Sequence, residues 1–246
     1  MGKIITVTSG KGGTGKTTTV GAVSSCLAVL GARTLCVDCD AGMRNLDITL
    51  GMTEYAVSDL SDVLRGGRTL ADACTEHPSL PGLFFLSAPT DLTLSDEDCD
   101  ATRDFLAAAR EDFDYVLLDS PAGIGAGFRL ASCGADSAVI VTTPDTACVR
   151  NAQRAAELLR DSGAGDIRLI INRVNARRMR RCGMTADDII DTAGVRLLGV
   201  VPDDPAVQIS ANSETPLLLG TTGGAARCFM NIARRINGEE VPLSVK

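Results

Sequence analysis

The sequence predicts an α/β fold with a mostly parallel central sheet and helices on both of its faces. Short apolar runs alternate with helix-like segments along the 246 residues. Several runs, such as 115–119 (YVLLD), are apolar without alternation, as is typical of strands buried on both faces. A glycine-rich turn follows the first run directly. Strands separated by helices favour a parallel sheet covered on both sides.

Each expected strand is an apolar or β-branched run bounded by polar or glycine residues. The first is KIITVT, followed by TLCVD and LFFLSA, then YVLLD, SAVIVTT, LIIN and RLLGVV. Valine, isoleucine and threonine pack well on a pleated surface, which favours strands over short helices here. The expected ranges in chain order are 3–8, 34–38, 83–88, 115–119, 137–143, 169–172 and 196–201.

The helices are expected between these strands. Thr185 is a natural N-cap, with Asp188 three residues later, so a helix is expected to begin there. The last helix is amphipathic, because Cys228, Phe229, Ile232, Ala233 and Ile236 share one face that we expect to pack on the core. The expected ranges are 16–30, 58–65, 69–74, 97–111, 146–161, 185–193 and 224–237.

The length favours one domain, since single α/β domains reach roughly 250 residues. We expect that domain over residues 1–238, followed by a short flexible tail over 239–246. A net charge of −7 argues against nucleic acid as a partner of the whole surface. No run approaches the roughly 20 apolar residues of a membrane span, and the N-terminus lacks a signal-peptide pattern. A cytoplasmic protein is expected.

The nine cysteines are expected to be free thiols in a reducing compartment, because their number is odd. Cys36 and Cys39 form a CxxC, but at the end of a strand they point to opposite faces. That geometry suits buried thiols better than a metal site or a disulfide. With His77 as the one histidine, zinc and Ser-His-Asp sites are not supported.

Residues 10–17, here called the phosphate loop, match G-x-x-x-x-G-K-[ST] in full between an expected strand and an expected helix. Glycines let backbone N–H groups turn inward around phosphate oxygens, and the helix N-terminus adds positive charge. The lysine in such a loop reaches the β- and γ-phosphates and the final hydroxyl binds Mg²⁺. The residues in order are Gly10, Lys11, Gly12, Gly13, Thr14, Gly15, Lys16 and Thr17.

Three aspartates are expected to face this loop. Asp119 ends the run VLLD, at the position of a Walker-B carboxylate that serves the metal. Asp38 and Asp40 follow a second buried strand directly. Ligands of open α/β sheets bind at the carboxyl ends of the strands, so these acids would lie at the same edge as the loop.

The details of these segments resemble one family. The second lysine, Lys11, in SGKGGTGKTTT is similar to the deviant Walker A sequence of the MinD/ParA family of P-loop ATPases, which implies a SIMIBI-type P-loop NTPase fold. Within that family, VDCDAGMRNLDITLG (37–51) and DSPAGIGAG (119–127) look like the switch segments of septum-site-determining MinD proteins. The similarity continues through TPDTACVRNAQR (143–154), INRVN (171–175) and LLGVVPDD (197–204), and covers nearly all of residues 3–240.

The resemblance implies ATP and Mg²⁺ as cofactors and gives a role to each matching position. Lys11 would reach across a dimer interface to the partner's nucleotide, acting like an arginine finger. Asp40 would position the attacking water, while Asp38 would support the Mg²⁺ environment. Asp119 would hold the metal through water, and Gly123 would sense the γ-phosphate through its N–H.

The remaining implied contacts concern the nucleotide's other parts. Lys16 would act as a catalytic as well as a binding residue, and Thr18 would be a further nucleotide-binding residue. Asn172 would read the adenine edge, with Pro202 and Asp203 lining the base.

The resemblance also implies a function: an ATPase that forms a homodimer with ATP and regulates where the cell divides. Its partners would be a division inhibitor and an ATPase-stimulating protein, with possible peripheral association at the inner face of the cell membrane. Such proteins usually end in a basic amphipathic helix, and the sequence 237–246 (NGEEVPLSVK) does not have that pattern.

Two other functions remain open. Four arginines, at positions 177, 178, 180 and 181, are expected to lie in a solvated loop, which could also bind phosphate groups. A ParA-like chromosome or plasmid segregation ATPase would use such basic residues on DNA. The second alternative is an ATP-gated adaptor with little hydrolysis. Iron–sulfur relatives of this family place cysteines in or near the second switch segment. The corresponding residues 119–127 contain no cysteine, so an iron–sulfur cluster is not expected.

Overall fold

The computed structural model of the chain describes residues 1–41, 43–55, 57–89 and 98–243. These residues form an eight-stranded sheet in the order β3-β4-β2-β5-β1-β6-β7-β8. All neighbouring pairs are parallel except β3 and β4, which are antiparallel. The strands are β1 (Lys3–Thr8), β2 (Thr34–Asp38), β3 (Thr75–Glu76), β4 (Leu83–Leu86), β5 (Tyr115–Asp119), β6 (Ser137–Thr142), β7 (Asp166–Val174) and β8 (Arg196–Pro202).

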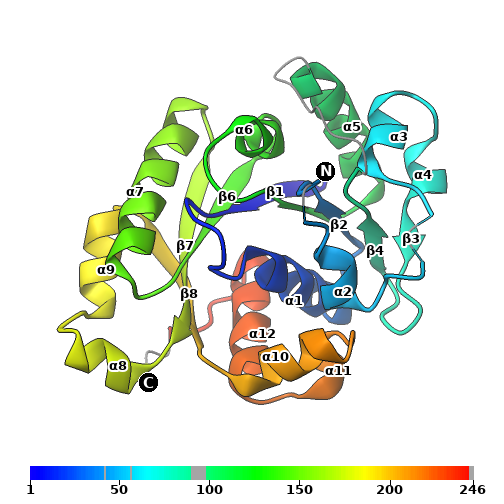
Figure 1. The fold of residues 1–246 in the computed structure, drawn as a ribbon. Coiled ribbons are helices and arrows are strands. Elements are labelled where there is room, and N and C mark those ends of the chain that lie inside the picture. The colour runs from blue at the N-terminus through cyan, green and yellow to red at the C-terminus, as the bar shows by residue number, and fades with distance from the viewer. Residues whose placement is uncertain (42, 56, 90–97, 244–246) are drawn as a thin grey trace.

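Helices cover both faces of this sheet (Figure 1). Their bounds are α1 (Lys16–Val29), α2 (Leu46–Leu50), α3 (Leu60–Leu64), α4 (Leu70–Ala73), α5 (Cys99–Asp112), α6 (Ala126–Ser132), α7 (Thr146–Asp161), α8 (Ala176–Arg181), α9 (Ala186–Ala193), α10 (Pro205–Asn212), α11 (Leu217–Gly220) and α12 (Gly224–Ile236).

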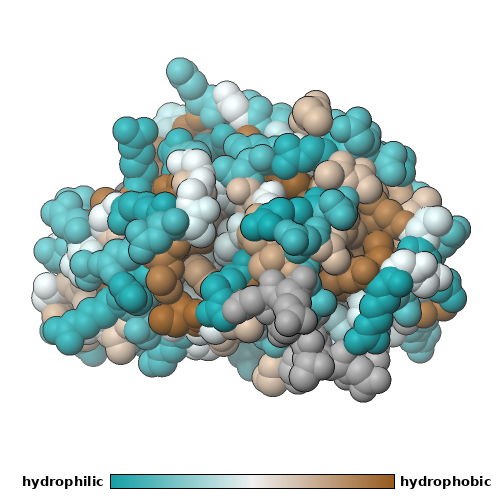
Figure 2. All heavy atoms as spheres, turned by 90° about the horizontal axis from the view of Figure 1, so that it is seen from above, coloured by the Kyte–Doolittle hydropathy of each residue, from teal (hydrophilic) through white to brown (hydrophobic). Residues whose placement is uncertain are grey.

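Alternating strand residues divide the core between the two faces. Ile5 and Val7 pack in one cluster with residues of α1 and α12, below the sheet in Figure 1. Ile4, the residue before Ile5, packs on the other face with residues of α3, α4 and α5. A third cluster joins β6 and β7 to α7 and α9. Seen from the side of α5, α6 and α7, the surface is mostly hydrophilic (Figure 2).

The predicted α/β class is confirmed, and so is the core face of the last helix. Phe229, Ile232 and Ala233 are fully buried against α1, β8 and their neighbours. The capping box predicted at Thr185 and Asp188 is also present. Cys36 and Cys39 are buried in different clusters, as expected for opposite faces of a strand. The start of the helix predicted over 97–111 falls at residue 97, outside the described residues.

The arginine-rich segment corrects one prediction. It is not a loop: residues Ala176–Arg181 form α8, whose N-cap is Asn175. The Asn175 side chain accepts a hydrogen bond from the Arg178 N–H at 3.1 Å, as N-cap residues do. No residue of α8 is buried, so its arginines are solvated on a helix. The only sequence signal for this helix was its capping residue, Asn175. The arginines that follow it were interpreted as a loop instead.

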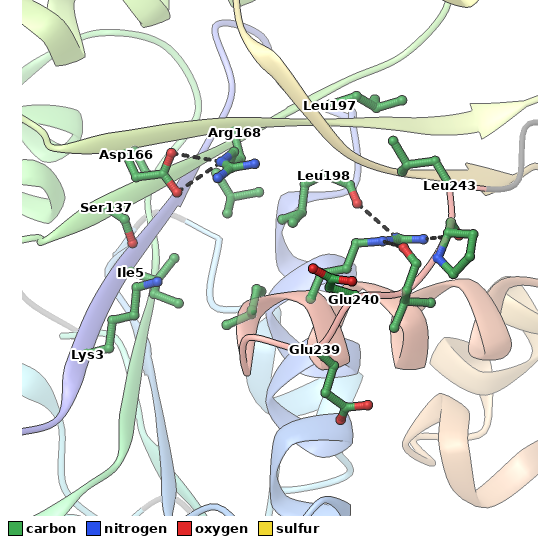
Figure 3. A pocket seen from close by; sticks show the side chains of 16 residues that line it. Lys3, Ile5, Ser137, Asp166, Arg168, Leu197, Leu198, Glu239, Glu240 and Leu243 are labelled. Carbon is green, nitrogen blue, oxygen red and sulfur yellow. Dashed lines mark hydrogen bonds and ion pairs between the residues drawn. The ribbon is translucent and has the colours of Figure 1, made fainter.

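The segment after α12 folds back along the edge where the parallel strands begin. A pocket of about 580 Å³ lies there, between the first residues of β1, β6 and β7 and the segment 239–243. Figure 3 shows Arg168 paired with Asp166 beside this pocket, at 2.7 Å from Nε to Oδ1. Arg235 donates to the Leu198 carbonyl at 2.9 Å and to the carbonyls of Val241 and Pro242 at 2.9 and 2.7 Å. Arg235 therefore fastens the C-terminal segment to β8.

Replacing Arg235 by alanine is expected to lower the free energy of unfolding by about 2 kcal/mol, because three carbonyls lose a charged donor. Arg234 is the matched control. Its side chain is 43% exposed and pairs with Glu239 at 2.8 Å, an interaction worth less than about 1 kcal/mol. Urea denaturation of Arg235→Ala and Arg234→Ala measures both. Equal losses in the two variants would contradict the anchoring role of Arg235.

None of the helices in the described ranges is long and apolar enough to cross a membrane. The single histidine, His77, is buried between β3 and α2. Its Nε2 lies 2.9 Å from the Leu50 carbonyl, and its Nδ1 accepts from the Ser79 N–H at 3.0 Å. His77 thus joins the short antiparallel strand to the helix that follows Asp38 and Asp40.

Candidate functional site

The phosphate loop runs from the end of β1 to the start of α1. Gly13 and Gly15 have φ values of 79° and 95°, in the left-handed region that favours glycine. Gly10 lies against the backbone of Asn151 in α7, so a side chain at position 10 would collide with that carbonyl. The Ser9 hydroxyl donates to the Lys11 carbonyl at 2.6 Å. Gly10 and Gly15 therefore lie too close to their neighbours for a side chain, and Gly13 and Gly15 have a backbone conformation that favours glycine.

The N-terminus of α1 opens directly from this loop, with Gly15 as its N-cap. No side chain caps the helix and its first turn contains no acid. The unpaired N–H groups and the positive end of the helix dipole therefore remain available to an anion. Phosphate groups bind at helix N-termini of this kind.

Lys16 is the cation buried at this helix end. It is 7% exposed and faces the carboxylates of Asp119 and Asp40. Burial lowers the pKa of its ammonium group, while both carboxylates act to raise it. When an anion enters the loop, Lys16 can exchange part of its interaction with these carboxylates for charge-assisted hydrogen bonds to phosphate oxygens.

Asp119 ends β5 beside the last residues of β1 and β2, in register with Val7 and Asp38. It is 1% exposed, and its Oδ1 has no hydrogen-bond partner in the described part of the chain. Burial, followed by the charge of Asp38, raises the pKa of its carboxyl to about 8, whereas a hydrogen bond from Thr17 and the charge of Lys16 lower it. A buried, unpartnered carboxylate oxygen is costly unless another group satisfies it.

Asp38 is the second buried carboxyl of the site. Its oxygens accept from the N–H groups of Asp40 at 2.8 Å and Leu46 at 3.3 Å, so it shapes the turn that leads to α2. Burial raises the pKa of Asp38 to about 6, and these two hydrogen bonds lower it. Asp40 is less buried and lies near enough to Lys16 to act to raise the pKa of the lysine. The three predicted aspartates therefore gather at one edge of the sheet.

This cluster fits Mg²⁺ together with phosphate oxygens. Mg²⁺ is usually held by one or two carboxylates, waters and substrate phosphates, with no all-protein cage. In the ranges that the structure covers, no three carboxylate, thiol or imidazole groups form a cation site by themselves. The Thr17 hydroxyl against the Asp119 carboxyl, with one carboxylate oxygen unsatisfied, offers the hydroxyl and carboxylate that the metal would use.

The second predicted switch segment adjoins the loop. A Cβ on Gly12 would lie 3.6 Å from the Cβ of Ala122, so the residues next to Gly123 face the exposed part of the loop. Gly123 itself has a φ of 91°, a conformation that favours glycine. Hydrogen bonds from Cys148 lower the pKa of the Asp145 carboxyl, and the exposed Lys11 lies near enough to add to that effect. Its ammonium group is therefore not buried with that of Lys16.

The residues predicted to contact the base line a separate pocket of about 660 Å³ next to the loop. Asn172, Pro202 and Asp203 come from β7, β8 and the turn after β8, and Thr18 from α1 closes one side. The Asn172 side-chain NH₂ donates to the Thr14 carbonyl at 2.8 Å. This bond ties the pocket to the phosphate loop.

The pocket also contains two cations that were not predicted to contact the base, Arg173 and Arg178. Arg173 follows Asn172 and has a φ of 53°, which is uncommon for a residue with a side chain. Arg178 comes from α8. The sequence signals were the segment INRVN, which contains Arg173, and the arginine-rich segment, which contains Arg178. The pocket under the C-terminal segment (Figure 3) is at the opposite edge of the sheet and contains none of the predicted residues.

Comparisons with known proteins agree with this geometry. The model of the CobQ/CobB/MinD/ParA nucleotide binding domain matches residues 5–217. The septum site-determining protein MinD of Synechocystis is 39% identical, over 98% of this chain and 92% of the relative. The MinC:MinD cell division protein complex of Aquifex aeolicus is similar with a TM-score of 0.89 and 33% identity, over 98% of both chains. A Pyrococcus horikoshii MinD solved with Mg-ADP has a TM-score of 0.85 and 28% identity, over 96% of both chains.

Proposed function

Because the chain belongs to the MinD proteins of the CobQ/CobB/MinD/ParA nucleotide-binding family, we propose that it is a Mg²⁺-dependent ATPase that dimerises on ATP. In this proposal residues 1–238 form one ATPase domain. Its role is the spatial regulation of cell division, in keeping with the septum site-determining proteins that it resembles over almost its whole length.

The observation that carries the proposal is the meeting of Lys16, Thr17 and three aspartates at one helix N-terminus. Phosphoryl transfer depends on positioning and on neutralising charge more than on covalent help from the protein. Lys16 and the N–H groups of the loop would bind the β- and γ-phosphates. Bound Mg²⁺, held by Thr17 and through water by Asp119, would neutralise charge that develops on the phosphate oxygens.

The remaining residues complete the proposed site. Asp40 would orient the attacking water, and Asp38 would keep Asp40 in place through its hydrogen bond to the Asp40 N–H at 2.8 Å. Gly123 would contact the γ-phosphate through its N–H. Asn172, with Pro202 and Asp203, would hold the base in the pocket next to the loop.

Lys11 supplies the link between dimerisation and turnover in this proposal. Its side chain is exposed on the loop, which supports a role in a second copy's site. A cation provided in trans stabilises the transition state only when two chains meet, so the nucleotide becomes a switch.

Light scattering with a non-hydrolysable ATP analogue tests that link. The wild-type chain is expected to double in mass, whereas Lys11→Ala is expected to stay monomeric and still bind the analogue. Lys3→Ala is the matched control, because Lys3 lies at the opposite end of β1. An analogue-dependent dimer of Lys11→Ala would overturn the role of Lys11 in trans.

Asp40→Ala is expected to keep the ATP-dependent dimer and to lose turnover by at least about 100-fold, because the water loses its orienting carboxylate. Phosphate release and light scattering on the same sample separate the two properties. An Asp40→Ala variant with the normal rate of phosphate release would refute this assignment.

The proposed partners are a second copy of the chain, a division inhibitor and an ATPase-stimulating protein. The similar Aquifex aeolicus structure is a MinC:MinD complex, which supports a partner of the inhibitor class. We place the protein in the cytoplasm, with peripheral association at the inner face of the cell membrane. Sedimentation with anionic liposomes, in ATP and in ADP, tests that association. Equal pelleting of the protein in the two nucleotides would contradict a nucleotide-dependent switch.

One observation favours a ParA-like segregation ATPase as the second candidate. One short helix, α8, carries four exposed arginines: Arg177, Arg178, Arg180 and Arg181. Binding of duplex DNA that weakens steeply with salt and is lost when these arginines are replaced would support it. The net charge of −7 opposes it, so nucleic acid is not a proposed partner.

A further inference from the structure

Two cysteines meet where the start of α5 lies beside the end of α6. Cys99 is the first residue of α5, and Cys133 is the C-cap of α6. The Cys133 thiol donates to the Cys99 carbonyl oxygen at 3.6 Å and to the Leu130 carbonyl oxygen at 3.2 Å, and the Cys99 thiol lies near enough to add to the effect of burial on the pKa of Cys133. They are 34 positions apart in sequence, so this contact is made by the packing of the two helices.

The surrounding contacts hold the two helix ends together. The Arg103 Nε on α5 donates to the Cys133 carbonyl at 3.1 Å. Gly134 packs so closely on Leu106 of α5 that a side chain at position 134 would collide with it. Both thiols are partly exposed, whereas Cys36 and Cys39 are buried. The pair therefore combines fixed proximity with access from solvent.

We propose that Cys99 and Cys133 form a reversible disulfide when the protein meets hydrogen peroxide. A disulfide needs its sulfurs about 2.05 Å apart, so the Cys133 side chain would turn from the Cys99 carbonyl to the Cys99 sulfur by rotating about χ1. The bond would be a modification site outside the nucleotide-binding site and does not depend on the proposed ATPase activity.

The chemistry balances with peroxide as the oxidant. The Cys99 sulfur attacks one peroxide oxygen, the O–O bond breaks, and a sulfenic acid and water form. The Cys133 sulfur then attacks the Cys99 sulfur, the S–O bond breaks, and a second water leaves. Two thiols are oxidised to one disulfide and one peroxide is reduced to two waters. A dithiol reductant reverses the bond by thiol–disulfide exchange.

The environment assigns the order of the two steps. Burial, followed by the charge and hydrogen bond of Cys99, raises the pKa of the Cys133 thiol to about 12, so Cys133 remains protonated. Cys99 is the first residue of α5 and is partly exposed. Peroxide therefore meets Cys99 first, and Cys133 resolves the sulfenic acid.

The bond would join the two helices on the face opposite α1. Helix α6 follows residues 119–125 directly, and that segment adjoins the phosphate loop. Closing a loop between residues 99 and 133 also restricts the unfolded chain. For a chain of this size the oxidised form is expected to melt about 5 °C higher than the reduced form.

Counting thiols and mapping the bond test the proposal. After a short exposure to peroxide, the folded wild-type protein is expected to lose two of its nine thiols and to recover them with dithiothreitol. Mass spectrometry of the unreduced digest is expected to show peptides that contain Cys99 and Cys133 joined. Melting curves of the oxidised and reduced protein give the shift in Tm as a readout independent of activity.

Matched variants keep the result decisive. Cys133→Ser is expected to lose the bond and to accumulate a sulfenic acid at Cys99 that a dimedone probe labels. Cys182→Ser removes an exposed cysteine on another part of the surface and is expected to oxidise as the wild type does. A bond from Cys133 to another cysteine such as Cys39, no loss of thiols, or an unchanged result in Cys133→Ser would overturn the proposal.

Discussion

Replacing Lys16 by alanine is expected to weaken the binding of Mg-ATP by at least about 100-fold, which corresponds to about 2.7 kcal/mol. A charged donor to phosphate oxygens contributes roughly 1.5–3 kcal/mol per hydrogen bond, and Lys16 is buried where the loop would place two phosphates. Its removal also leaves the buried Asp119 without the positive charge of Lys16. Both effects oppose the entry of a further anion.

Isothermal titration with a non-hydrolysable ATP analogue and Mg²⁺ measures this loss. Lys3→Ala is again the control, because Lys3 carries the same charge at the other end of the same strand. A dissociation constant of Lys16→Ala within about threefold of the wild type would mean that the phosphates bind elsewhere.

Asp119→Asn is expected to make the nucleotide-free protein more stable while abolishing Mg²⁺-dependent turnover. Burial raises the pKa of Asp119 from 3.8 to about 8, so the folded chain holds a proton that the unfolded chain has released. Stability therefore falls as the pH rises from about 4 to 8. Asparagine cannot ionise. Above about pH 8 the free energy of unfolding of Asp119→Asn is therefore expected to exceed that of the wild type by on the order of 2 kcal/mol.

Urea denaturation without Mg²⁺ or nucleotide measures this gain. The advantage of Asp119→Asn over the wild type is expected to be larger at pH 8.5 than at pH 5, because the wild-type carboxyl is protonated at the lower pH. Asp104→Asn is the control, since Asp104 is exposed on α5. An advantage that does not grow with pH, or undiminished phosphate release by Asp119→Asn, would contradict the assigned environment and role of Asp119.

The sequence was most informative where structure depends on local pattern. The phosphate loop could be predicted because its glycines and lysine must have fixed spacing between a strand and a helix. The meeting of Asp38 and Asp119 could be predicted because each ends a buried strand, and parallel strands end at one edge. Neither inference needed the position of a distant residue.

The sequence was least informative where structure depends on packing between distant segments. The short helices α2 and α11 were missed because neither has a side-chain cap at its N-terminus, unlike the equally short α3 and α4 that the sequence predicted. The antiparallel strand β3 consists of Thr75 and Glu76 and is stabilised by pairing with β4. The anchoring of residues 241 and 242 by Arg235, like the contact of Cys99 with Cys133, arises only once the chain has folded.

The rate of phosphate release per chain, followed as the protein concentration rises at saturating Mg-ATP, tests the central claim most directly. The proposed trans role of Lys11 predicts release that requires Mg²⁺ and a rate per chain that increases with concentration until all chains are paired. A rate per chain that is independent of concentration would contradict a dimeric ATPase, and the absence of any release in a single turnover with protein in excess would contradict an ATPase altogether.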